Sequence, residues 1–221
     1  MNDRPRPFDL IVFDWDGTLC DSTALIVRCI QAACRDLGVP EPTDRAAAQV
    51  IGLSLGNALR EAVPSLDDAR YTQLVERYRH HYFGNNHGVA LFDGVLDMLA
   101  TLRARHHWLA VATGKSRRGL SEALQACGLN AVFDATRTAE ETASKPHPMM
   151  LLELMREFGA DPERTLMIGD TSHDLLLAAN AGVAAVAVSY GAHDAASLAA
   201  LNPRHLAHDV ADLHQWLREN T

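Results

Sequence analysis

The sequence predicts an α/β fold: a doubly wound parallel sheet with a small, all-helical domain inserted after the first strand. Two observations support this prediction. After residue 105, short apolar segments alternate with helical segments, which is typical of parallel strands that are buried on both faces. Between residues 21 and 88 the pattern predicts helices alone, so this segment interrupts the sheet rather than extending it.

The first part of the chain is predicted to be one strand followed by four helices. Asp21 or Ser22, Thr43 and Ser54 are expected to cap three of these helices, because short polar side chains accept hydrogen bonds from the first helical amides. The expected elements are strand 10–13 and helices 22–37, 43–50, 55–63 and 67–82, followed by a flexible connector over 84–88.

The rest of the chain is predicted to contribute four more strands. Gly128, Gly159 and Gly182 are expected to end three helices, because glycine readily adopts the left-handed conformation that closes a helix. The expected strands are 108–112, 132–135, 165–168 and 183–188, the expected helices are 94–105, 116–127, 147–158 and 172–180, and the tail over 195–219 is expected to be mostly helical. Residues 1–20 and 89–221 would then form the core, and residues 21–88 a helical cap.

Composition excludes several classes of function. The 221 residues carry a formal net charge of −8, which argues against nucleic acid as the main partner and against docking to an anionic membrane. No apolar run is long enough to span a bilayer, and residues 1–7 read as a disordered leader rather than an export signal. The four cysteines form no Cys-x-x-Cys pair, so we expect buried thiols in a cytoplasmic protein. The sequence does not decide whether the protein is a monomer or a homodimer.

Two carboxylates follow the first strand at positions 14 and 16. Residues i and i+2 of an extended strand face the same way, so Asp14 and Asp16 are expected to point into one small volume. Two like charges held this close are costly unless a cation or a shared proton compensates them. The pair therefore indicates a metal ion, a nucleophile or both, with an acidic surface turn as the plainer alternative.

Polar groups also stand at three other places where the predicted sheet is expected to end. Ligands of open α/β sheets bind at such carboxyl ends of the strands. Phosphoryl transfer needs a nucleophile, an acid for the leaving oxygen, donors for the equatorial oxygens and oxygen ligands for Mg²⁺. Asp14 and Asp170 are candidate metal ligands, and Thr113, the Gly114 amide and Lys145 are candidate phosphate ligands. The segments are Thr113-Gly114-Lys115-Ser116, Lys145-Pro146 and Gly169-Asp170-Thr171-Ser172-His173-Asp174.

In this order and at strand ends, the motifs resemble those of the haloacid dehalogenase superfamily, in its phosphoglycolate-phosphatase-like branch with a helical cap inserted after the first motif. The resemblance covers about residues 8–217, and its most specific parts are Asp14-Trp15-Asp16-Gly17-Thr18-Leu19 and the segment 169–174. It implies a Rossmann-like core, a Mg²⁺ cofactor, and hydrolysis of a small phosphorylated metabolite through an aspartyl-phosphate.

The resemblance also implies a role for each residue of the motifs. Asp14 would be the nucleophile and a metal ligand. Asp16 would be the general acid and then the general base, with its backbone carbonyl on the metal. Thr113 and Gly114 would bind the phosphoryl group, and Lys145 would pair with Asp14 and the phosphate. Asp170 would ligate Mg²⁺ directly, and Asp174 would support the metal site.

Each of these residues also has a plainer interpretation. Thr113 could cap the following helix, Lys145 could be a solvated lysine before a proline, and Asp174 could stabilise a helix dipole from the first turn. Lys115 is expected to be exposed rather than catalytic. For His147 and His173 an exposed or supporting position is expected, although both lie near the predicted site.

Other functions of related chemistry fit less well. Gly114-Lys115-Ser116 imitates the end of a P-loop, but Leu109 stands where that loop needs glycine. Within the superfamily, dehalogenases lack the second acid of the first motif, and phosphonate hydrolases have alanine at the position of Asp16. Sugar phosphomutases carry a cap histidine and a cap arginine where Ile26 and Leu55 align. The sequence leaves a pyrophosphatase activity open as an alternative function.

Two non-enzymatic alternatives also remain open: a phospho-accepting signalling domain and a non-catalytic relative that binds a partner. Signalling receivers carry their acceptor aspartate on a later strand and lack a large helical insertion. The substrate is not fixed by the sequence, since phosphoglycolate, a sugar phosphate, a nucleotide monophosphate and pyrophosphate all fit. The apolar loop Ile51-Gly52-Leu53-Ser54-Leu55 is expected to face the site, which hints at a small or weakly polar leaving group.

Overall fold

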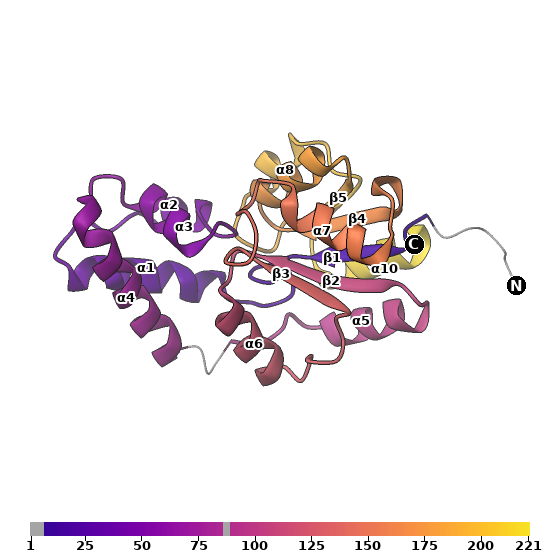
Figure 1. The fold of residues 1–221 in the computed structure, drawn as a ribbon, viewed down its shortest axis with the longest axis horizontal. Helices are drawn as coiled ribbons and strands as arrows, with labels where there is room; N and C mark the ends of the chain where they lie inside the picture. Colours follow the sequence, from indigo (N-terminus) through magenta and orange to yellow (C-terminus); the bar gives the residue numbers. More distant parts are fainter. Residues whose placement is uncertain (1–6, 86–88) are drawn as a thin grey trace, which may run out of the picture.

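The computed structural model describes residues 7–85 and 89–221, and over these residues it has the predicted α/β architecture. A six-stranded, all-parallel sheet has the order β3-β2-β1-β4-β5-β6, so that β1 lies between β2 and β4 near its centre (Figure 1). The strands are β1 (Leu10–Phe13), β2 (Trp108–Thr113), β3 (Ala135–Thr138), β4 (Thr165–Gly169), β5 (Ala184–Val188) and β6 (Leu206–Ala207).

Helices cover both faces of the sheet because side chains alternate along each strand. Ile11 and Phe13 of β1 face one layer, and Leu10 and Val12 face the other; all four are fully buried. The first layer contains α5 (Val95–Ala104), α6 (Arg117–Ala126) and α10 (Val210–Asn220), and the second contains α7 (Met149–Phe158) and α8 (Ser172–Ala181). The short helix α9 (Ala195–Ala199) packs beside β5 and β6, and a 3₁₀ turn over Pro162–Arg164 leads into β4.

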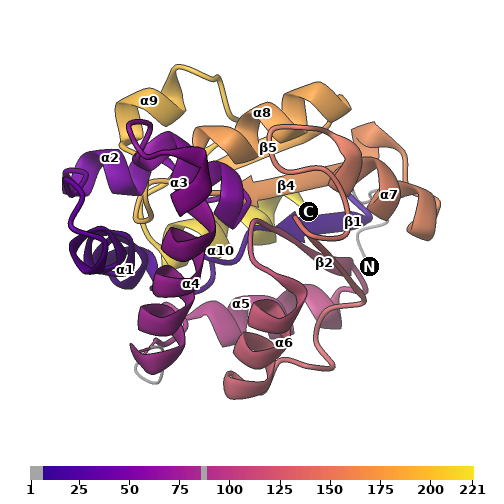
Figure 2. The same cartoon turned by 60° about the vertical axis from the view of Figure 1, so that its left-hand side comes forward.

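Four helices form an insert between β1 and α5, with a hydrophobic cluster of its own. Ile30, Leu59 and Leu74 are among its fully or nearly fully buried members. Figures 1 and 2 show these helices standing to one side of the sheet, beyond the end at which β1 stops. The helices of the insert are α1 (Thr23–Asp36), α2 (Asp44–Gln49), α3 (Leu55–Ala62) and α4 (Asp68–Asn85).

Three predicted elements differ from the structure. The strand expected over 132–135 is β3, which begins at Ala135, because Val132 and Phe133 pack against the core from the turn before it. The tail is mostly helical, as predicted, with α9 and α10, but β6 adds between them a sixth strand that the sequence did not indicate. Helix α4 continues to Asn85, three residues beyond its predicted end. Residues 86–88 of the expected connector and residues 1–6 of the expected leader lie outside the described residues.

Of the predicted helix caps in the insert, two are confirmed and one differs. Thr43 and Ser54 accept hydrogen bonds from the amides of Ala46 and Asn57, at 3.2 and 3.4 Å, so both are confirmed. Ser22 occupies the cap position of α1, but its hydroxyl makes no capping bond and donates instead to Oδ1 of Asp16 at 2.6 Å. The start of the insert is thereby bonded to the acidic motif that precedes it.

Leu74→Ala tests whether the insert has a hydrophobic core separate from the sheet. Leu74 is fully buried, and such a truncation costs about 2–5 kcal/mol. We expect faster hydrogen–deuterium exchange in peptides of α1–α4 and unchanged exchange in β1, β2 and β4. Thr72→Ala, at an exposed position of the same helix, is the control. Equal acceleration in the insert and the sheet would contradict the separation.

Candidate active site

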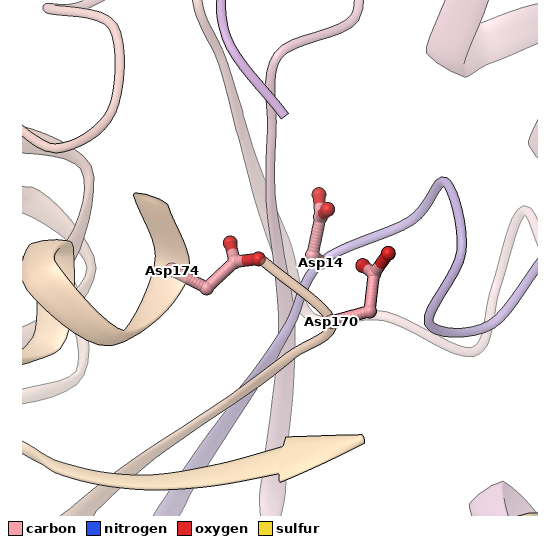
Figure 3. A group of neighbouring side chains, drawn as sticks. All are labelled: Asp14, Asp170 and Asp174. Carbon is pink, nitrogen blue, oxygen red and sulfur yellow. The ribbon is translucent and has the colours of Figure 1, made fainter. Parts of the chain in front are cut away.

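Three carboxylates meet at the carboxyl end of the central strands. Asp14 follows β1, Asp170 follows the neighbouring strand β4, and Asp174 lies in the first turn of α8. One oxygen from each lies within 4.8 Å of the others, and the three side chains are no more than 1% exposed. Figure 3 shows the three carboxyl groups gathered around a common space. We call Asp14, Asp170 and Asp174 the aspartate trio.

Hydrogen bonds fix two members of the trio. The hydroxyl of Thr18 donates to Oδ1 of Asp170 at 2.8 Å, and the amide of Ala192 donates to Oδ2 at 2.7 Å. Asp174 accepts hydrogen bonds from the amide and hydroxyl of Thr171, at 3.1 and 2.7 Å, in a capping box at the start of α8. Neither oxygen of Asp14 accepts a hydrogen bond of good geometry from the described residues.

Glycines allow the chain to come this close to Asp170. A Cβ atom at Gly17 would lie 2.1 Å from Oδ2 of Asp170, and one at Gly191 would lie 2.2 Å from it. Gly17 also has a φ of +80°, in the left-handed region that favours glycine. The glycine of the first motif is therefore required by packing at the site as well as by the turn.

Lys145 supplies one positive charge inside the trio. Its fully buried ammonium lies 2.8 Å from Oδ1 of Asp14 and 2.6 Å from Oδ1 of Asp174. Burial alone lowers the pKa of Lys145, but the attraction of these two carboxylates outweighs it and raises the pKa. The interpretation of Lys145 as a solvated lysine is therefore wrong.

The trio retains an excess of negative charge. Burial raises the pKa of Asp14 to about 7, since Lys145 only partly opposes the loss of solvation and Asp174 repels the charge. Burial likewise raises the pKa of Asp170, with Asp14 and Asp174 adding repulsion. Three carboxylates and one ammonium have a formal charge of −2, so a divalent cation with a preference for oxygen ligands fits this donor set.

Asp16 lies outside the trio and faces the insert. Its carboxylate accepts hydrogen bonds from Nζ of Lys115 at 2.9 and 3.1 Å, and Lys115 also donates to the hydroxyl of Tyr82 at 2.7 Å. The prediction that Lys115 is exposed is wrong, because its side chain is only 8% exposed. The sequence signal for a buried Lys115 was its position two residues after Thr113, at a strand end. Its partner Tyr82, however, lies far away in the sequence.

Thr113 and Gly114 lie where β2 ends. Thr113 is buried, and its hydroxyl accepts a hydrogen bond from the amide of Lys115 at 3.2 Å. Ser116, rather than Thr113, caps α6 by accepting from the amide of Gly119 at 3.0 Å. A Cβ atom at Gly114 would lie 2.3 Å from the carbonyl oxygen of Leu53, so the insert rests directly on this strand end.

The histidines connect the insert to the core. His147 is exposed, and Nε2 of His173 lies 3.0 Å from the carbonyl oxygen of Gln49 in the insert. His193, which the sequence did not reveal, places Nε2 3.1 Å from the same carbonyl and accepts from the amide of Ser172 at 3.0 Å through Nδ1. Burial lowers the pKa of His193, which favours the neutral ring that this acceptor role requires.

Comparisons with known proteins identify the family. The model of the haloacid dehalogenase-like hydrolases matches residues 11–188, and the chain belongs to this family. It is 40% identical to a probable phosphatase IndB of Dickeya dadantii (88% of this chain, 87% of the relative). It is 32% identical to a phosphoglycolate phosphatase of Mannheimia succiniciproducens (93% and 96%) and 33% identical to a 5'-nucleotidase of Pseudomonas aeruginosa (100% of both).

The fold is shared with solved structures. A predicted phosphoglycolate phosphatase from Haemophilus somnus superposes with a TM-score of 0.84 at 27% identity, over 96% of this chain and 99% of the other. The protein is therefore an enzyme of the hydrolase class, and its similar relatives differ in the substrates that their names state. None of the described helices combines the length and the apolar character needed to cross a membrane.

The raised pKa of Asp14 predicts a pH dependence of stability in protein treated with a chelator. The folded state holds this proton up to a pKa of about 7, whereas the ordinary value is 3.8. The resulting stabilisation is complete below the lower value and is lost as the pH rises through the higher one. Asp14→Asn should therefore gain stability relative to the wild type from pH 5 to pH 7, by at most about 1.4 kcal/mol per pH unit.

Urea unfolding of both proteins across this pH range checks the difference. Asp194→Asn, which removes an exposed carboxylate, is the control. A difference between Asp14→Asn and the wild type that stays constant with pH would contradict a raised pKa at Asp14.

Proposed function

We propose that the protein is a Mg²⁺-dependent phosphatase that hydrolyses a small phosphate monoester through an aspartyl-phosphate at Asp14. The observation that carries this proposal is the aspartate trio, in which neither oxygen of Asp14 accepts a hydrogen bond of good geometry from the described residues and Oδ1 is paired with the Lys145 ammonium at 2.8 Å. A carboxylate can attack phosphorus and form an aspartyl-phosphate, and an oxygen that accepts no hydrogen bond keeps its lone pairs available for this attack. Membership of the hydrolase family and the names of the relatives agree with this activity.

The same residues would hold the metal ion. Asp14 and Asp170 offer carboxylate oxygens, Asp174 supports the site beside Lys145, and the backbone carbonyl of Asp16 is a further candidate ligand. When bound, Mg²⁺ would neutralise the excess negative charge and polarise the phosphoryl oxygens. The wider donor set of carboxylates and carbonyls, without sulfur, agrees with a hard cation.

The protein residues would carry the two chemical steps. An oxygen of Asp14 attacks phosphorus while the bond to the leaving oxygen breaks and Asp16 donates a proton to that oxygen. Asp16 then takes a proton from water, which attacks phosphorus and releases phosphate and free Asp14. Thr113, the Gly114 amide and Lys145 would bind the phosphoryl oxygens and stabilise their charge.

We further propose that residues 21–88 act as a cap over a core of residues 1–20 and 89–221. The insert contacts the strand ends at Gly114 and bonds to the core where the amide of Ser54 donates to Oγ of Ser144 at 2.8 Å. A closed cap would exclude bulk water during formation of the phosphoenzyme. The four cysteines are free thiols, which supports the proposed cytoplasmic location.

The identity of the substrate within this class stays a proposal. The similarity to a phosphoglycolate phosphatase supports a phosphoglycolate-like monoester, and similarity to a 5'-nucleotidase supports a nucleotide. Ile26 and Leu55, which align with the cap histidine and arginine of phosphomutases, are apolar and line a cavity beside Asp16. Their character supports hydrolysis over transfer to a sugar.

Asp14→Asn should remove nearly all turnover, since uncatalysed monoester hydrolysis is extremely slow and no other group would replace the nucleophile. Hydrolysis of p-nitrophenyl phosphate with added Mg²⁺ measures the loss, and circular dichroism checks the fold. A chelator should abolish wild-type turnover and added Mg²⁺ should restore it. Asp161→Asn, in the loop before β4, is a matched control. Substantial turnover by folded Asp14→Asn would count against the mechanism.

Asp16→Asn should slow formation of the phosphoenzyme more for poor leaving groups than for good ones, because the lost proton matters most when the departing oxygen is basic. Rapid-quench measurement of the alcohol released in the first turnover, from p-nitrophenyl phosphate and from an alkyl phosphate, gives the two rates. Losses differing by about tenfold or more would support the acid role, which is typically worth 10²–10⁴-fold. Equal slowing for both esters would rule out this role.

A further inference from the structure

A cavity of about 320 Å³ lies between the insert and the strand ends. Asp16, Gly114 and Lys115 form its inner end, next to the groups proposed to handle the phosphate. The loop over 51–55 lines it, as the sequence predicted. A leaving group bonded to a phosphate at Asp14 would therefore extend toward the insert.

Much of the wall that the insert contributes to this cavity is apolar. Ile26 and Ile30 of α1 and Leu55 of α3 contribute aliphatic surface, and α4 contributes Val75 and Tyr78. These residues come from three helices of the insert and belong to its hydrophobic cluster or pack against it. A ligand there would gain mainly from burial of its own apolar surface.

The charged residues of the lining already have partners. Lys115 is paired with Asp16 at 2.9 Å, and burial leaves both side chains at most 10% exposed. Arg79 lies 3.9 Å from Glu140, and each of these two side chains is about half exposed, at 51%. Lys115 is therefore already committed to Asp16, and the loosely paired, half-exposed Arg79 is the one other described cation of the lining, so little positive charge is offered to the carboxylate that a phosphoglycolate-like leaving group would bring into this space.

The size and shape of the lining suit a ring. Tyr78 and Tyr82 are stacked with centroids 5.8 Å apart, and Phe83 packs edge-on to Tyr82 at 5.9 Å. A cavity of roughly 150 Å³ lined by apolar side chains is enough for benzene, so this one has room for a ring and a short linker. Aromatic rings prefer such offset or edge-on neighbours.

We propose that the alcohol released by this enzyme is apolar and of the size of a substituted ring, so that its preferred substrates are phosphate monoesters of hydrophobic alcohols rather than of glycolate or sugars. This inference rests on the proposed phosphatase activity and names its substrate class. The phosphate would remain at the aspartate trio, and the hydrophobic part would occupy the cavity between α1, α3 and α4.

Three esters that release alcohols of similar basicity are compared. Differences in kcat/KM between them then report recognition of the alcohol rather than the chemical step. We expect kcat/KM for 2-phenylethyl phosphate to exceed that for ethyl phosphate and for 2-phosphoglycolate at least tenfold, mainly through a lower KM, because the ring buries apolar surface. Equal values, or a preference for 2-phosphoglycolate, would overturn the inference and leave the phosphatase activity intact. No turnover of these esters or of p-nitrophenyl phosphate would overturn the proposed function and the inference with it.

Leu55→Asn tests the wall directly, because it exchanges an apolar lining residue for a polar one of similar size. We expect the ratio of kcat/KM between 2-phenylethyl phosphate and ethyl phosphate to fall at least threefold. Asn57→Ala, exposed on the same helix and outside the lining, should keep the wild-type ratio. Thermal unfolding checks both folds, and Val75→Thr provides a second polar substitution should Leu55→Asn fail to fold. An unchanged ratio in the folded lining variants would contradict the placement.

Binding of non-hydrolysable phosphonates gives a readout besides turnover. We expect 3-phenylpropylphosphonate to bind at least tenfold more tightly than methylphosphonate by calorimetry, and the Leu55→Asn variant to reduce this preference. Equal affinities would overturn the inference even if ester hydrolysis is observed.

Discussion

The structure depends on the burial of three carboxylates around a single ammonium group. Asp14, Asp170, Asp174 and Lys145 are all nearly fully buried, and their combined formal charge is negative. Such a group is costly unless each oxygen has a partner or a cation is bound. Asp170 and Asp174 have hydrogen-bond partners from the backbone and from threonines. Asp14 has no such partner among the described residues, and its charge is balanced instead by the Lys145 ammonium, 2.8 Å from Oδ1.

The sheet makes this arrangement by its strand order. Because β1 pairs with β4 in parallel, their carboxyl ends deliver Asp14 and Asp170 side by side, and helix α8 returns Asp174 to the same point. Its start is fixed by the capping box of Thr171, so the same bonds begin a helix and orient a site residue. Gly17 permits the close packing that this requires. The same bonds and packing contacts therefore stabilise the strand ends and set the geometry of the site.

Local sequence was sufficient where one segment determined the outcome. The strand Leu10–Phe13, the acids at its end and the caps Thr43 and Ser54 could all be predicted, because apolar runs and capping residues act on their immediate neighbours. The structure brings Lys145 to the acids as the sequence suggested. The roles given to the individual site residues remain predictions, since geometry alone does not establish a reaction.

The missed features depend on partners far away in the sequence. Lys115 is buried because Tyr82 comes from the insert, and no pattern near either residue signals their contact. His193 connects the core to the insert through the carbonyl of Gln49, 144 residues earlier. The two residues of β6 are too few to give a periodic pattern, so their pairing with β5 was invisible in the sequence.

The site divides into a charged half on the core and an apolar half on the insert, and Asp16 stands at the boundary. Its carboxylate is bonded to Ser22 at the start of α1 and to Lys115, which is bonded in turn to Tyr82 of α4. The insert also rests on Gly114 and on the histidines beside the Asp170 loop. A movement of the insert must therefore alter the surroundings of Asp16 while the trio stays anchored to the sheet. Under the proposed mechanism, changes in the insert would alter which leaving group is accepted without disturbing the groups proposed to hold the phosphate.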